Sequence, residues 1–112
     1  MTRSTLGDLE RLVLLSVVRL GDGTYGAEVQ REIRERTSRD VTPGTIYPTL
    51  DRLEKKGLVR SWMGEATPER GGRARRHYAV LPEGLVLAAE AWRDIAALAE
   101  GIEGRLRGAT GE

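Results

Sequence analysis

Residues 41–59 read VTPGTIYPTLDRLEKKGLV, and this stretch decides how the chain folds. Ile46, Leu50 and Leu53 recur at the spacing of an α-helix, which predicts a short helix with one apolar face. A glycine just after the last periodic residue is a common stop signal, and Gly57 stands there. The stretch therefore predicts a helix that packs one side against a core and leaves the other side outside.

Two prolines fall in the opening turns of this expected helix. Pro43 follows Thr42, a good N-cap residue, and takes the first helical position, where its missing N–H costs nothing and its fixed φ is already helical. Pro48 removes one hydrogen bond, and its ring crowds the carbonyl of Gly44, whose missing side chain lets the backbone adjust. We therefore expect a helix with slightly distorted first turns and no break.

The side of this helix opposite the apolar stripe is polar, and it is basic at its far end. Pro48 shares this side with four residues spaced 4, 3 and 4 apart, namely Thr45, Thr49, Arg52 and Lys56. Threonine suits base edges and thymine methyl groups, and cationic side chains suit phosphates or guanine. The pattern is that of a helix that meets a polar, anionic partner.

The segment before this stretch predicts two more helices. The first covers residues 6–20 with Thr5 as its expected N-cap, and the second follows Thr24 as its expected N-cap. The middle of the first helix is apolar on nearly every side, which is more than a small domain can bury alone. We therefore expect a second chain to cover Leu15 and Val18.

A β-hairpin is expected after the third helix. Leu58–Met63 and Arg75–Val80 are rich enough in β-branched and aromatic residues to form strands, and the segment between them contains turn residues. A dense basic cluster runs through the loop and the second strand: Arg70, Arg73, Arg75, Arg76 and His77. Because two strands alone are marginally stable, the hairpin must lean on the helices.

The C-terminal segment carries a heptad pattern. Apolar residues separated alternately by three and four positions are Leu85, Ala88, Trp92, Ile95, Ala99, Ile102 and Leu106. We expect one continuous helix over residues 83–106 that pairs with a second copy, and fraying from Gly104 onward because glycines lower helix propensity.

Composition limits the classes of function. The chain has 112 residues, which fits one domain. It has no cysteine and a single histidine, which argues against disulfides and against a zinc or other metal site, and it offers no spacing typical of a catalytic nucleophile with its base. No segment resembles a membrane span or a signal peptide. We therefore expect a cytoplasmic protein that is not an enzyme, needs no cofactor and has no membrane partner.

The basic excess lies in the first part of the chain. Residues 1–80 hold 15 Lys and Arg against 11 Asp and Glu, whereas residues 81–112 hold 3 against 6. Three helices followed by a basic hairpin are the order of a winged helix-turn-helix. We expect a mainly α fold with a small β-hairpin: a DNA-binding domain at 1–81, a long dimerisation helix at 82–107 and a frayed tail at 108–112.

In a winged helix-turn-helix the third helix enters the major groove and the hairpin meets phosphates or the minor groove. Two copies related by a dimer axis would then bind a pseudo-palindromic stretch of double-stranded DNA. The expected DNA contacts are Thr45, Tyr47, Pro48, Thr49, Arg52, Lys56, Arg73, Arg75 and Arg76. The hairpin arginines have an ordinary alternative reading, since edge strands often carry charge to prevent aggregation.

The sequence resembles the PadR-like transcriptional regulators. The matching segments are LGDLERLVLLSV at 6–17, TYGAEV at 24–29, PGTIYPTLDRLEKKGLV at 43–59, and GRARRHYAV with the following glycine at 72–84. The chain departs from the family at Leu81, where a threonine usually caps the last helix. The resemblance implies a homodimeric repressor whose first and last helices pair between subunits.

The resemblance also implies roles for two aromatic residues. The hydroxyl of Tyr47 looks more like a phosphate contact, and the alternative is that the tyrosine is a core aromatic. Trp92 is expected to pack in the dimer seam, and in some relatives a flat aromatic effector molecule binds between the two last helices. The other function class to weigh is a winged helix that binds only proteins, for which an apolar or acidic outer face of the third helix would be typical.

Overall fold

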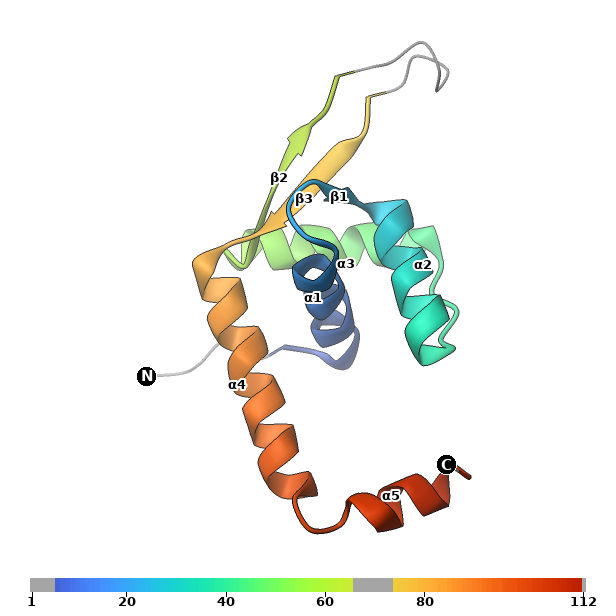
Figure 1. Ribbon diagram of the computed structural model, residues 1–112. Helices are drawn as coiled ribbons and strands as arrows, with labels where there is room; N and C mark the ends of the chain where they lie inside the picture. The colour runs from blue at the N-terminus through green and yellow to red at the C-terminus, as the bar shows by residue number, and fades with distance from the viewer. Residues whose placement is uncertain (1–5, 66–73, 112) are drawn as a thin grey trace.

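The computed structural model describes residues 6–65 and 74–111, which form five helices and three short strands (Figure 1). Their bounds are α1 Asp8–Leu20, β1 Thr24–Tyr25, α2 Gly26–Thr37, α3 Pro43–Lys55, β2 Val59–Met63, β3 Arg76–Val80, α4 Pro82–Ala99 and α5 Glu103–Ala109. This order is that of a winged helix-turn-helix followed by a C-terminal helical segment, as the sequence predicts. Within these residues, no helix combines the length and the apolarity that a membrane crossing requires.

Helices α1, α2 and α3 pack around one core that the sheet closes from above (Figure 1). The three strands are antiparallel in the order β1–β3–β2. Residues buried at this centre come from every layer: Val13, Leu14, Val17, Val29, Ile33, Ile46, Leu50, Leu53, Leu58, Val59 and Tyr78. Because each of the three helices turns its apolar face to this one core, the opposite face of α3 is left at the surface.

The third helix begins and ends where the sequence predicts. Pro43 is its first residue and Thr42 its N-cap, and the helix continues through Pro48 without a break. It stops at Gly57, whose φ of 77° lies in the left-handed region that glycine adopts without strain. Local residue chemistry was therefore sufficient to place this helix.

The start of the second helix differs from the prediction. Thr24 was expected to cap it, but Thr24 forms the short strand β1 with Tyr25, which is the N-cap, and pairs with Tyr78 of β3. The Thr24 hydroxyl donates to the Glu28 carboxylate at 2.9 Å. A two-residue strand leaves no periodic signal, and it exists only because β3 offers a free edge. Thr5, the expected cap of the first helix, lies outside the described residues.

The prediction of one continuous C-terminal helix over 83–106 is wrong. Helix α4 ends at Ala99, the chain turns at Gly101, and α5 leads away in a new direction (Figure 1). Gly101 has a φ of 87°, a conformation that only glycine adopts readily, and its N–H donates to the Glu103 carboxylate at 2.8 Å. The expected fraying from Gly104, with a tail at 108–112, is wrong as well, because α5 continues to Ala109.

Candidate nucleic-acid interface

Helix α3 buries its large aliphatic side chains and exposes most of its polar ones. Ile46, Leu50 and Leu53 have no exposed surface. Beyond the exposed Pro43 of the first turn, the side chains left at the surface are Thr45, Tyr47, Pro48, Asp51, Arg52, Lys55 and, at the C-cap, Lys56. We call these seven residues the outer face of α3; it is polar and carries charges of both signs.

Thr49 does not belong to this outer face, so its predicted contact with a base edge is wrong. The residue is completely buried, and its hydroxyl donates to the Thr45 carbonyl at 2.7 Å. The same oxygen accepts a hydrogen bond from Arg52 Nη2 at 3.1 Å. Position 49 lies next to the apolar stripe of the helix. Because the hydroxyl keeps a hydrogen bond to the helix backbone, its burial leaves no donor unsatisfied. Thr49 orients Arg52 and supports the helix from within.

Two residues of the outer face were missed by the sequence analysis. Asp51 and Lys55 follow Pro48 at spacings of 3 and 4, so these three residues form the middle of the exposed side. The sequence shows the same helical spacing for these residues, but the prediction assigned the exposed side of the helix to the row that contains the threonines. Burial raises the pKa of Tyr78 to about 12, and the Asp51 carboxylate adds to this rise. Asp51 therefore lies where the outer face meets the sheet.

Tyr47 is half exposed, so the core reading of this tyrosine is wrong. Its ring lies against the first residue of α2, since a Cβ added at Gly26 would come within 2.5 Å of the Tyr47 ring and 2.8 Å of its hydroxyl oxygen. Only glycine leaves room for the ring at this place. The tyrosine is therefore held on the surface near the start of α3, with its hydroxyl at the junction of two helices.

The two basic residues at the far end of α3 are held by an acidic residue of α1. The Glu10 carboxylate accepts from the Gly7 backbone N–H at 2.7 Å and from Lys56 Nζ at 3.0 Å. Arg52 Nε lies 4.0 Å from the same carboxylate. Burial alone would raise the pKa of Glu10, but the bonds from Lys56 and Gly7 and the charge of Arg52 outweigh burial and lower the pKa below its usual value. Glu10 is therefore ionised at neutral pH.

The hairpin arginines that were expected to act together lie on opposite faces of the sheet. Arg76 faces α3, where its Nη1 donates to the Ser61 hydroxyl at 3.0 Å, and Ser61 in turn donates to the Glu54 carboxylate at 2.8 Å. Arg75 lies on the other face with its guanidinium carbon 4.1 Å from the centre of the Tyr25 ring. Arg70 and Arg73 lie outside the described residues. Of the described pair, Arg76 is the one beside α3.

A row of aromatic rings crosses the face of the sheet that points away from α3. His77 stacks on Trp62 with ring centres 5.9 Å apart, and its Nδ1 lies 2.7 Å from the Gly23 carbonyl oxygen. The guanidinium carbon of Arg60 lies 4.5 Å from the centre of the Trp62 ring. Arg60 is a basic residue of the hairpin that the sequence did not indicate, because it lies in the first strand, outside the cluster of arginines in the loop and second strand. These contacts fix the base of the hairpin against the helical body.

Most of the expected dimer residues are exposed apolar side chains. Leu15 is 46% exposed, Trp92 66% and Ile95 54%. Leu85, Ile102 and Leu106 are exposed as well, and Val18 and Ala99 are half-buried. Ala88 is an exception: it is buried in the chain's own core against α1, so its assignment to the seam is wrong. An apolar groove of about 150 Å³ between α1 and α4 is lined by Leu12, Leu15, Trp92 and Ile95, among others.

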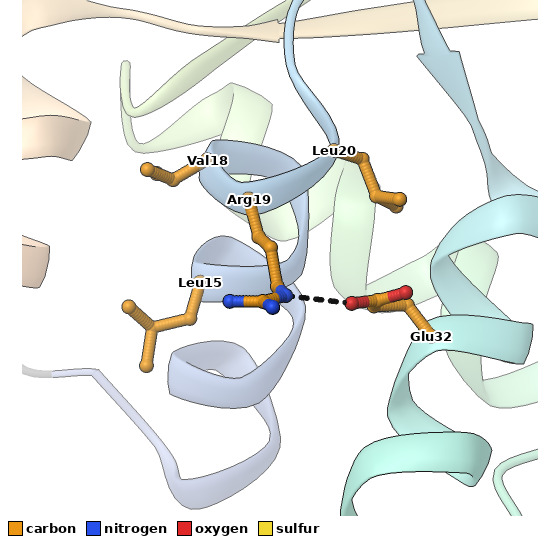
Figure 2. Close-up of a pocket in the computed structure, with 5 residues that line it drawn as sticks. All are labelled: Leu15, Val18, Arg19, Leu20 and Glu32. Atoms are coloured by element: carbon orange, nitrogen blue, oxygen red, sulfur yellow. Dashed lines mark hydrogen bonds and ion pairs between the residues drawn. The ribbon is translucent and has the colours of Figure 1, made fainter.

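A second groove opens on the other side of α1, against α2. Figure 2 shows its lining, in which Leu15 and Val18 point away from α2 and Arg19 reaches toward Glu32. Arg19 Nε lies 2.9 Å from the Glu32 carboxylate, which also pairs with Arg36. Leu15 and Val18 therefore form an apolar strip on the side of α1 that no other element of the described chain covers.

Comparisons with known proteins agree with this architecture. Residues 14–90 match the Transcriptional regulator PadR-like family. The chain is 39% identical over 80 residues to the Transcriptional regulator Rv3488 of Mycobacterium tuberculosis, and the match covers 71% of this chain and 70% of the relative.

Two solved structures have similar folds. A Streptococcus transcriptional regulator superposes with a TM-score of 0.66 at 28% identity, over 88% of this chain and 96% of the other. A PadR family transcriptional regulator from Eggerthella lenta superposes with a TM-score of 0.68 at 27% identity, over 88% of this chain and 86% of the other. The chain therefore belongs to the PadR-like family, whose members are DNA-binding transcriptional regulators and not enzymes.

Proposed function

We propose that this chain acts as a homodimer that binds a pseudo-palindromic operator, represses transcription from it and is released by a small aromatic molecule. The observation that carries the proposal is the outer face of α3, where Tyr47 is held half exposed while Ile46, Leu50 and Leu53 of the same helix are fully buried. A helix that keeps a tyrosine and charged residues on a free surface is suited to the major groove.

Within this proposal the outer face divides the work of recognition. Thr45, Pro48 and Asp51 face the base edges, and the Asp51 carboxylate can accept a hydrogen bond from the N4 amino group of cytosine. Tyr47 and Arg76 contact phosphates on either side and fix the register of the helix. Phosphate contacts give affinity without sequence preference, so Asp51 is the residue from which most discrimination is expected.

The homodimer is supported by the apolar surface of α1 and α4. Full burial of a large apolar side chain contributes about 1.5–3 kcal/mol, and Leu15, Trp92 and Ile95 are each about half exposed or more in the single chain. A second copy related by a two-fold axis would cover the same residues on both chains. The two α3 helices would then be related by the same axis, which imposes the symmetry of the operator.

The effector is supported by the groove between α1 and α4. It has a volume of about 150 Å³ and an almost entirely apolar lining that includes Trp92, which offers a flat ring for stacking. Because the groove lies where the two chains would meet, an occupant would change the spacing between the two α3 helices. This is how binding there would lower the affinity for the operator.

Fluorescence anisotropy with duplexes from the region upstream of the protein's own coding sequence tests the proposal. We expect binding to one palindromic duplex at least a hundredfold tighter than to a scrambled duplex of equal length. Arg76→Ala should weaken binding to both duplexes alike and lower the salt dependence by about one phosphate contact. Weak binding that is equal for all duplexes would exclude an operator-specific regulator and favour the protein-interaction module.

A further inference from the structure

The Glu10 carboxylate is buried between the first turn of α1 and the far end of α3. The residue is 7% exposed. One oxygen, Oε1, has its two hydrogen-bond donors, but Oε2 has no well-aligned donor among the described residues. Oε2 instead lies 2.9 Å from Lys56 Nζ and 4.0 Å from Arg52 Nε. Among the described residues, the charge of this buried atom is therefore balanced by ion pairs, and the pair with Lys56 is the shorter of the two.

This arrangement constrains Lys56 more than Arg52. If the Lys56 ammonium left Glu10 for a DNA phosphate, a buried carboxylate would lose its nearest counter-charge, which is strongly unfavourable. A phosphate on the DNA surface is hydrated and screened by salt. Its attraction for the Lys56 ammonium is therefore weaker than that of the buried Glu10 carboxylate. The Arg52 side chain is 54% exposed and touches the carboxylate only at its edge, so it can turn outward at little cost.

We propose that Glu10 is a positioning residue that withholds Lys56 from DNA phosphates, taking the place of a phosphate inside the protein. The proposal rests on the proposed function, in which α3 enters the major groove. Glu10 thereby lowers the affinity for all DNA sequences alike and holds the far end of α3 against α1. The predicted phosphate contact of Lys56 is replaced by this internal pair.

The variant Glu10→Gln tests the proposal, because it keeps the shape and the oxygen that accepts from Gly7 but removes the charge. The ion pair with Glu10 is then lost, so the Lys56 ammonium can turn to a phosphate. Each added phosphate contact steepens the plot of log affinity against log salt by about 0.9, so the loss of affinity from about 50 to about 200 mM salt should grow roughly threefold. Affinity for a scrambled duplex at low salt should rise as well.

Glu32→Gln is the matched control. It removes the same charge from another carboxylate that pairs with two arginines, but Glu32 lies in the α1–α2 groove of Figure 2 and not on α3. Its salt slope should equal that of the wild type. This comparison separates the release of Lys56 from a mere change in net charge.

The double variant Glu10→Gln, Lys56→Met should return the slope to the wild-type value. It replaces a buried ion pair with uncharged groups of similar volume, which proteins commonly tolerate, and circular dichroism establishes that it is folded in the assay. A wild-type slope for Glu10→Gln would overturn the proposal, and so would a double variant about one contact shallower than the wild type. A wild type without any salt-dependent DNA binding would instead overturn the proposed function, and the inference would fall with it.

Discussion

Gly84→Ala is expected to destabilise the protein although alanine is the better helix former. Gly84 lies in the first turn of α4, where a Cβ would come within 2.1 Å of the Leu58 carbonyl oxygen and 3.0 Å of Val80 Cγ2. The same carbonyl accepts a hydrogen bond from Leu81 N–H at 2.9 Å, so it cannot move freely. A normal contact between carbon and oxygen is more than about 3.3 Å, so α4 and the sheet would have to separate by roughly 1 Å.

Two opposing energies decide the sign. The gain in helix propensity from glycine to alanine is at most about 1 kcal/mol, whereas overpacking against backbone costs about 1–3 kcal/mol or more. A clash with backbone belongs at the upper end of this range, about 3 kcal/mol. After the gain in helix propensity is subtracted, we expect the free energy of unfolding to fall by about 2 kcal/mol. For a chain of this size that loss corresponds to a fall in the melting temperature of about 8–16 °C.

The assay is thermal unfolding followed by circular dichroism at one protein concentration, because the proposed dimerisation would make melting temperatures depend on concentration. Gly104→Ala is the control, since a Cβ at Gly104 meets nothing within 4 Å and the variant should not lower the melting temperature. Adding Val80→Ala to Gly84→Ala should not restore stability, because the clash with the carbonyl remains. A Gly84→Ala protein as stable as the wild type would refute the close approach of α4 to the sheet.

Four further changes have defined outcomes. Ile95→Asp should convert the proposed dimer to a monomer at micromolar concentration, as measured by sedimentation, because it would bury a charge in the proposed apolar seam. Asp51→Asn should shift the preferred base from cytosine to adenine at one position of each half-site. The binding free energies for a panel of substituted duplexes should differ by about 1–3 kcal/mol at that position. Gly26→Ala should displace the ring of Tyr47 and weaken operator binding by about 1 kcal/mol, with little change in melting temperature. The folded-state pKa of Glu10 is lowered, so its stabilisation is complete above the unfolded value of 4.5 and is lost as pH falls through the folded value. The difference in melting temperature between the wild type and Glu10→Gln should therefore shrink from about pH 6 to about pH 3.

The sequence by itself determined the winged helix-turn-helix order and the position of the third helix. Thr42, Pro43 and Gly57 act through backbone geometry within a few residues, so their effect can be read without any knowledge of the fold. Ile46, Leu50 and Leu53 point to one side whatever they pack against, and that side became the core. The exposed apolar residues of α4 were visible in the same way, because periodicity is a local property.

Only the tertiary structure decided which polar residues of α3 face outward. Thr49 stands at the border of the apolar stripe, and the neighbouring elements bury it. Glu10 and Lys56 are 46 positions apart, and a pair at this separation has no signature in local spacing. The pairing of Thr24 with Tyr78 likewise depends on a strand that arrives much later in the chain. The end of α4 before Gly101 was overlooked because the apolar heptads continue across it, while the left-handed backbone at that glycine turns the chain. Periodicity reports which faces are apolar, but a contact between distant residues exists only once the chain has folded.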